Sequence, residues 1–214
     1  MGLDMDFEKI LVSIREEIEA DDAVREKTLP LARSAVRKCS QSIKESHRGN
    51  FSEAKEHLND AYSLINDAKS ELEGSKYVSK SRALDTAYQE FVEAAYVLPL
   101  LEKGVLTMAE DYDIPSRQHL TGLADTIGEL RRAVLDALRK DDLDKAEGFL
   151  HFMEKIQEEL QTFDFPNALI PELRRKCDVG RSIIERTRGD VTTAVRQSKL
   201  IYELKNLEDN IGKD

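Results

Sequence analysis

The stretch TAYQEFVEAAYVLPLL, residues 86–101, decides the fold class of this chain. Its apolar residues recur at spacings of three and four, which is the period of one face of an α-helix and not the alternation of a β-strand. With the residues just before it, the stretch forms one continuous apolar stripe made of Leu84, Tyr88, Phe91, Ala95 and Leu98. The pattern predicts a helix that is packed into a core over residues 77–102.

The same helical period runs through the rest of the chain. Glycine and proline are scarce, with 10 and 5 residues, and they fall between the periodic segments. No segment alternates convincingly as a strand. We therefore expect an all-α, single-domain bundle of about seven helices over residues 1–214, joined by short loops. The expected spans are 4–47 with a kink at Pro30, 51–72, 77–102, 107–112, 116–140, 142–161 and 171–210.

The composition excludes several classes of protein. The 214 residues contain 32 Lys and Arg against 42 Asp and Glu, a net charge of −10, which argues against duplex DNA binding by bulk charge but leaves room for a local basic groove. No apolar run is long enough to cross a membrane, and the first residues, MGLDMDFEKI, carry acids where a signal peptide carries positive charge. Cys39 and Cys177 form no metal or disulfide framework, so we expect reduced thiols in a cytoplasmic protein.

Two glutamates interrupt the apolar stretch at 86–101. Glu90 and Glu93 are its only charged residues, and they lie about 60° apart on one side of the expected helix. Neither has a Lys or Arg three or four positions away, so no neighbour on the same helix neutralises them.

A second acidic pair occurs in the helix expected at 116–140. Asp125 and Glu129 are four residues apart, opposite the apolar stripe of that helix, and Arg132 shares their side. Gly122 and Gly128 flank the pair and would let another backbone or a ligand come close.

Four carboxylates from two helices are the oxygen ligands that Mg²⁺ and Mn²⁺ prefer. Two such ions roughly 3.5–4 Å apart can activate water and stabilise the leaving oxygen in phosphodiester cleavage. Arg132 could stabilise the developing phosphate charge. The simpler interpretation is that these acids lie on solvated helix faces, because pairs at such spacings are common among 42 acids. Spacing alone does not decide between the two.

Other sequence signals are weaker. The chain has no P-loop, nucleophile elbow or dinucleotide fingerprint. Its four histidines lack zinc-binding spacing, and we expect them at the surface or at helix ends: His47, His57, His119 and His151. Basic residues cluster at 174–188, RRKCDVGRSIIERTR, and around Lys80 and Arg82. Such rows can bind a phosphate backbone, although a helix surface paired with the many acids is the preferred interpretation of any single cluster.

The two acidic segments resemble known motifs. YQEFVEAA at 88–95 and GLADTIGELRR at 122–132 resemble the translin family, particularly its translin-associated factor X (Trax) branch. The late segment LRRKCDVGRSIIERTRGD at 173–190 also fits, and the resemblance covers roughly residues 8–190. Residues 189–214 extend beyond it as a C-terminal helical extension.

The resemblance implies a fold and an activity. The family is all-α, with about seven helices per subunit, and its members form hollow octamers that enclose single-stranded RNA or DNA. By resemblance, the metal-binding catalytic carboxylates of a Trax-like ribonuclease are Glu90, Glu93, Asp125 and Glu129, with Mg²⁺ as cofactor and Mn²⁺ as a substitute. Translin itself has apolar residues where Glu90 and Glu93 stand, which favours the cleaving branch.

The resemblance also implies how nucleic acid is held and how subunits assemble. Lys80 and Arg82 fall in the region of translin's basic nucleic-acid-binding patch, and with Arg132 they are the candidate phosphate contacts. A single chain of this prokaryotic type is expected to form a homo-octamer in the cytoplasm, without a membrane partner.

Three hypotheses remain open from the sequence. The first is a Mg²⁺-dependent endoribonuclease that cuts single-stranded RNA. The second is an oligomer that binds single-stranded RNA or DNA without cutting it. The third is a helical adaptor, suggested by the acidic surface and by a weak repeat that relates residues 47–58 to residues 139–150.

Overall fold

The computed structural model describes residues 2–73, 75, 77, 82–107 and 112–211. Within these ranges the chain forms long α-helices and no β-strand, which confirms the predicted all-α class. The helices are α1 (Gly2–Arg48), α2 (Phe51–Leu72), α4 (Asp85–Lys103), α5 (Ser116–Leu138), α6 (Leu143–Gln161) and α7 (Leu173–Ile211).

Helix ends depart from the sequence prediction at three places. The helix expected from residue 77 has its regular part from Asp85, whose carboxylate lies in the first turn of α4 and pairs with Arg82. α5 ends at Leu138, because the following turn contains Asp141 at a positive φ of 58°. α7 begins at Leu173, because Glu172 before it has a φ of 69° and cannot belong to a right-handed helix.

The short helix expected at 107–112 falls mostly outside the described residues, and the residues at its two ends, 107 and 112, are not helical. Pro30 lies inside α1, which continues through it to Arg48.

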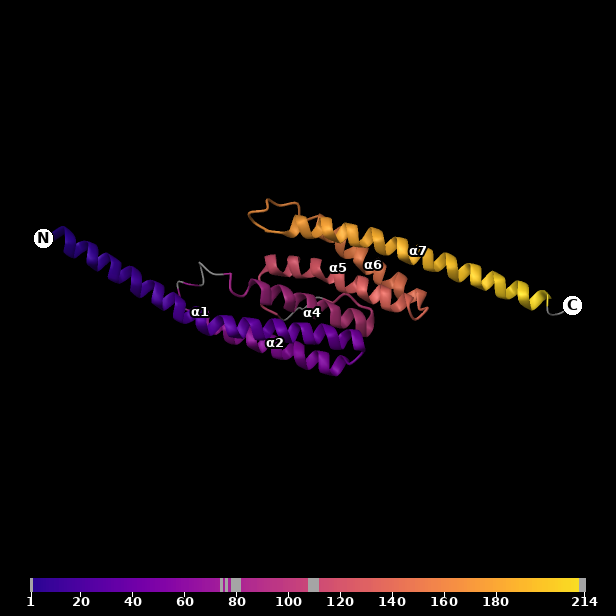
Figure 1. The fold of residues 1–214 in the computed structure, drawn as a ribbon, viewed down its shortest axis with the longest axis horizontal. Helices are drawn as coiled ribbons and strands as arrows, with labels where there is room; N and C mark the ends of the chain where they lie inside the picture. Colours follow the sequence, from indigo (N-terminus) through magenta and orange to yellow (C-terminus); the bar gives the residue numbers. More distant parts are fainter. Residues whose placement is uncertain (1, 74, 76, 78–81, 108–111, 212–214) are drawn as a thin grey trace.

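α4 occupies the middle of the bundle. The α1–α2 hairpin packs on one side of it, while α5 packs on the other side and carries α6 and α7 (Figure 1). The α1–α2 hairpin turns at Gly49, whose left-handed φ of 82° suits a residue without a side chain.

Two hydrophobic clusters meet at α4. Phe91 and Leu98 belong to the cluster shared with α1 and α2, while Val92 and Leu100 belong to the cluster shared with α5, α6 and α7. Because α4 is buried from both directions, a charged residue within it stands out, and Glu90 and Glu93 are such residues.

Two glycines let the helices around the site approach closely. A Cβ at Gly122 of α5 would lie 2.4 Å from the carbonyl oxygen of Gln89 and 2.8 Å from the Cβ of Val92, both in α4. A Cβ at Gly180 of α7 would lie 3.1 Å from Ile127 of α5 and 2.7 Å from the side-chain oxygen of Gln157. These contacts bring α4, α5 and α7 together along the edge that carries the acidic residues.

The ends of α1 and α7 extend beyond the bundle in opposite directions (Figure 1). Among the described residues, none of the helices combines the length and the apolar character needed to cross a membrane.

Candidate metal centre

The four predicted carboxylates come from the two facing helices at the centre of the bundle. α4 contributes Glu90 and Glu93, and α5 contributes Asp125 and Glu129. The charges of Asp125 and Glu129 raise the pKa of Glu90 and of Glu93, and a hydrogen bond from Gln89 to Asp125 joins the two helices beside them. The fold therefore gathers the two sequence pairs into one acidic cluster.

The acids on α4 ionise with difficulty. Burial raises the pKa of Glu93 to about 8, and repulsion from Glu90, Asp125 and Glu129 adds to this effect. The pKa of Glu90 is also raised, first by burial and then by the charge of Asp125, with a partial offset from Lys176. A nearby cation would stabilise the ionised form of both carboxylates.

Asp125 is held by two side chains from neighbouring helices. The Lys176 ammonium group, on α7, donates to Oδ1 at 2.5 Å and to Oδ2 at 2.6 Å, and the lysine side chain is only 11% exposed. The Gln89 amide, on α4, donates to Oδ2 at 2.6 Å. A cationic group of the protein thus occupies one side of the acidic cluster.

Glu129 has a different partner. Nε2 of His47, in the last turn of α1, lies 2.6 Å from Oε2 of Glu129, and the histidine side chain is 5% exposed. This hydrogen bond is the main reason why the pKa of Glu129 is lowered. Arg132 lies 3.7 Å from the same oxygen and is half-exposed.

The remaining sequence candidates lie elsewhere. Arg82 is exposed and pairs with Asp85 at the start of α4, and none of its described contacts involves the four carboxylates. Lys80 falls outside the described residues. Of the two candidate phosphate contacts that the structure describes, Arg132 lies beside the acidic cluster and Arg82 does not.

Sequence reasoning missed three residues of the cluster. Gln89 belongs to the acidic motif and was the easiest to find. Lys176 was visible only as one member of a basic run, and nothing in the sequence links it to Asp125. His47 was expected at the surface or at a helix end; it does lie at the end of α1, but it is buried against a residue 82 positions away.

The donor set fits a hard divalent cation, because it consists of carboxylate oxygens whose mutual repulsion a cation would relieve. In the described part of the chain, no group of three or more His, Cys, Asp or Glu side chains is arranged to hold a metal as the side chains lie. The carboxylates of Asp125 and Glu129 are instead turned to Lys176 and His47. Metal binding would require these contacts to rearrange.

A cavity of about 170 Å³ opens beside Asp125 and Lys176, between α5 and α7. Gly128 and Gly180 line it, and a Cβ at Gly128 would meet no other atom within 4 Å. Gly128 therefore borders open space, and the close approach predicted for the two glycines is found at Gly122 instead.

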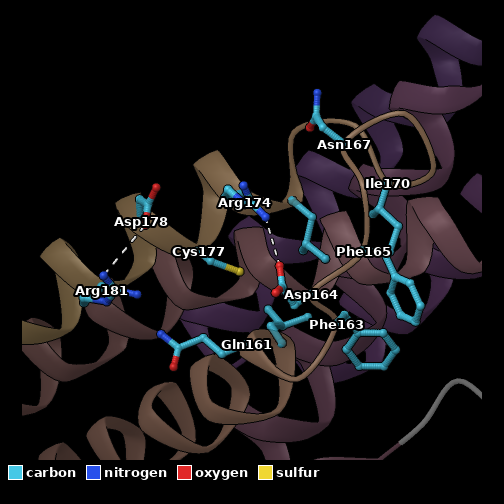
Figure 2. A pocket seen from close by; sticks show the side chains of 12 residues that line it. Gln161, Phe163, Asp164, Phe165, Asn167, Ile170, Arg174, Cys177, Asp178 and Arg181 are labelled. Carbon is cyan, nitrogen blue, oxygen red and sulfur yellow. Dashed lines mark hydrogen bonds and ion pairs between the residues drawn. The ribbon is translucent and has the colours of Figure 1, made fainter.

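The basic run at 174–188 is largely neutralised. A cavity of about 230 Å³ lies at the start of α7. Among its lining residues, Arg174 pairs with Asp164 and Arg181 pairs with Asp178 (Figure 2). Three more of its basic residues pair with acids: Arg175, Lys176 and Arg188. The preferred interpretation of this run, a helix surface paired with acids, agrees with these contacts.

The fold and the cluster together define a class: an all-α bundle in which the two central helices each contribute two carboxylates to one partly buried group. The sequence profile of the Translin family matches residues 8–188. The chain belongs to the Translin family.

Similar proteins agree with this assignment. An uncharacterized protein of Methanocaldococcus jannaschii is 34% identical over 195 residues, which cover 90% of this chain and 86% of that protein. The crystal structure of AfC3PO is 35% identical, with a TM-score of 0.79, and that of AfC3PO in complex with duplex RNA is 34% identical, with a TM-score of 0.78. Each covers 87% of this chain and 97% of the solved chain. Apo-NeC3PO, at 20% identity over 86% of this chain and 96% of its own, shares the fold with a TM-score of 0.75.

Proposed function

We propose that this protein is a Mg²⁺-dependent endoribonuclease of the Trax-like branch, which cuts single-stranded RNA inside a hollow homo-octamer in the cytoplasm. Glu90, Glu93, Asp125 and Glu129 would hold the cation, and Mn²⁺ would serve as a substitute. The two free, buried cysteines support a reducing compartment.

The proposal rests on one observation. The four carboxylates stand on the facing helices α4 and α5, which a hydrogen bond from Gln89 to Asp125 joins, and burial together with the charges of Asp125 and Glu129 raises the pKa of both Glu90 and Glu93. Carboxyl groups whose pKa is raised in this way are typical of functional sites. Lys176 pairs with Asp125 and only partly offsets the raised pKa of Glu90 and Glu93, so a bound cation would stabilise the ionised form of the α4 pair.

The residues of the chain have distinct roles in this proposal. A bound divalent cation would supply charge neutralisation and Lewis-acid activation for phosphodiester hydrolysis. Gln89 orients Asp125 through its amide, and His47 orients Glu129. Arg132, half-exposed beside Glu129, is positioned to contact a phosphate. Lys80 and Arg82, which precede α4 in the sequence, are further candidate contacts for the RNA backbone.

RNA as the ligand is supported by AfC3PO, a similar protein whose structure has been solved in complex with duplex RNA. We propose unpaired RNA as the preferred substrate of this chain, with single-stranded DNA as a weaker ligand. The octamer is the assembly that the family resemblance implies.

A second candidate function is RNA binding without cleavage. It is favoured by the contacts of Lys176 and His47, which engage two of the four carboxylates with groups of the protein itself. This candidate predicts salt-sensitive RNA binding and no products at any metal concentration. A helical adaptor, in contrast, would bind no RNA.

The test is a cleavage assay with the purified full-length chain and labelled RNA, single-stranded and duplex, in Mg²⁺, Mn²⁺ or EDTA. Glu90→Gln and Asp125→Asn keep the side-chain shapes and remove the charges. Loss of a hydrogen-bond partner of a metal ligand typically lowers metal affinity or activity by about 10–100-fold. We therefore expect loss of a ligand itself to slow cleavage by about 100-fold or more.

Glu147→Gln is the matched control, because Glu147 is an exposed acid on α6 outside the cluster. Its cleavage rate is expected to equal that of the parent. Cleavage that survives EDTA, or equal rates for the parent and both cluster variants, would contradict the proposed site.

A further inference from the structure

The ends of α1 and α7 carry many of the large apolar side chains that stay exposed in the described part of the chain. We define the N-tail as residues 7–22 of α1 and the C-tail as residues 196–210 of α7. Both tails are helical and project from opposite ends of the molecule (Figure 1). Their side chains are almost all exposed.

Each tail carries an apolar stripe with the spacing of a coiled coil. In the N-tail the stripe is Phe7, Leu11, Ile14 and Ile18, with steps of four, three and four residues. In the C-tail it is Leu200, Leu204 and Leu207, with steps of four and three. All seven side chains are between 48% and 61% exposed. Alternation of three and four is the pattern with which two helices pack along a seam.

Exposed apolar stripes of this kind mark interaction surfaces. The two tails of one chain cannot cover each other, because they leave the bundle at opposite ends (Figure 1). An anionic membrane surface is a poor partner for the N-tail, which has six acids and two bases. RNA is excluded as its partner for the same reason.

Charge selects between the possible tail pairs. Two N-tails side by side would bring together twelve acids and four bases. The C-tail instead carries three bases and three acids, so its Arg196, Lys199 and Lys205 can lie near the acids of an N-tail. The lengths also match, since 15 or 16 helical residues span about 23–24 Å.

We propose that the N-tail of one copy pairs with the C-tail of a second copy as an antiparallel two-helix coiled coil. The inference rests on the self-assembly included in the proposed function and names the surface that forms it. A two-fold axis that reverses one copy end to end would place both N-tails beside both C-tails, so each interface forms twice. The antiparallel register sets Ile14 opposite Leu204, flanked by Leu11 opposite Leu207 and Ile18 opposite Leu200.

Disulfide trapping tests this pairing directly. Ile14→Cys and Leu204→Cys are made separately in the full-length chain, mixed and oxidised with glutathione disulfide. Native Cys39 and Cys177 are buried and contribute little background. We expect a cross-linked dimer whose linked peptides, identified by mass spectrometry, join position 14 to position 204. The rate of cross-link formation should exceed that of the control mixture by about tenfold or more, because a disulfide needs Cα atoms within about 7 Å.

The control mixture is Ser13→Cys with Ser198→Cys, two exposed positions on the same tails but off the stripes. Links only between two copies of position 14, or only between two copies of position 204, would overturn the proposed pairing. So would equal rates in the two mixtures.

Native mass spectrometry of the parent protein distinguishes failure of the tail pairing from failure of the proposed assembly. An octamer that gives no 14–204 link refutes the tail pairing and leaves the proposed assembly standing. A monomer refutes both.

Discussion

Glu93 is the carboxylate of the cluster that is hardest to ionise, because α4 buries it and three other acids repel it. Its pKa of about 8 in the folded chain compares with 4.5 in an unfolded chain. Between these values the folded protein keeps the proton that the unfolded protein releases. The contribution of Glu93 to stability is therefore best below pH 4.5 and declines as the pH rises through about 8.

Glu93→Gln removes this dependence. In EDTA we expect the variant to be more stable than the parent at pH 8 by about 1–2 kcal/mol, a rise in Tm of roughly 2–8 °C. Below pH 4.5 the difference should vanish. Thermal unfolding followed by circular dichroism at one fixed protein concentration measures both values, and a difference that does not change with pH would contradict the burial argument.

Lys176 holds Asp125 through its ammonium group, which is largely buried. Under the proposed function the lysine and the divalent cation compete for this carboxylate. We expect Lys176→Met to bind Mn²⁺ about tenfold more tightly in isothermal titration calorimetry, because removal of one opposing charge favours binding by roughly 1.4 kcal/mol. Methionine retains the length and the buried stem of the side chain.

Arg174→Met is the control for Lys176→Met, since Arg174 is a nearby base on α7, is exposed and pairs with Asp164 outside the cluster. Its Mn²⁺ affinity should match that of the parent. Weaker Mn²⁺ binding in Lys176→Met would mean that the lysine organises Asp125 for the metal rather than competing with it.

At the scale of helices, the site depends on how closely α5 approaches α4. Gly122 makes that approach possible, because a Cβ there would overlap the Gln89 carbonyl oxygen at 2.4 Å. Gly122→Ala must separate the two helices, and overpacking of this kind costs about 1–3 kcal/mol. The same shift would move Gln89 away from Asp125. We expect a lower midpoint in urea unfolding together with weaker Mn²⁺ binding.

Gly148→Ala provides the opposite case within the same protein. Gly148 lies in α6 with no atom within 4 Å of an added Cβ, and its backbone is helical. The substitution should stabilise the protein by about 0.5–1 kcal/mol through helix propensity alone. If both variants shifted the midpoint in the same direction, close helix packing would not be the reason for Gly122.

The weak repeat in the sequence has a structural counterpart. The turn between α1 and α2 and the turn between α5 and α6 meet at one cavity, which Gly49, Phe51, Asp142 and Phe149 help to line. Asn50 and Asp142 stand at the N-caps of the helices that follow. The repeat therefore marks the turns of two helical hairpins within one bundle.

These elements indicate how far sequence reasoning reaches. Helical period and motif spacing predicted α4 and α5 and the acids they carry, because those signals are local. The ends of α5 and α7 depend on single residues in left-handed conformations, Asp141 and Glu172, whose types do not require them. The partners Lys176 and His47 lie 51 and 82 positions from the acids they contact, and no local pattern encodes such distances.

At the scale of the whole molecule, α4 joins two clusters that would otherwise be separate. Phe91 faces the α1–α2 side, while Val92, the next residue, faces α5, α6 and α7. Each side would lose buried residues of its core if α4 left. We therefore predict that the chain unfolds as one cooperative unit, as expected of a single domain.

Phe91→Ala tests this cooperativity at a distance. Phe91 is fully buried in the α1–α2 cluster, and truncating such a side chain costs about 3–5 kcal/mol. If α4 couples the two clusters, amide hydrogen exchange should accelerate by the same factor in α6 as in α2, although α6 belongs to the other cluster. Leu135→Ala, at a half-exposed position of α5, should leave both helices protected. Faster exchange confined to α1 and α2 would mean that the α5–α7 side stays folded without the α1–α2 side. In that case Glu129 would lose its contact with His47 of α1 before the rest of the acidic cluster unfolds.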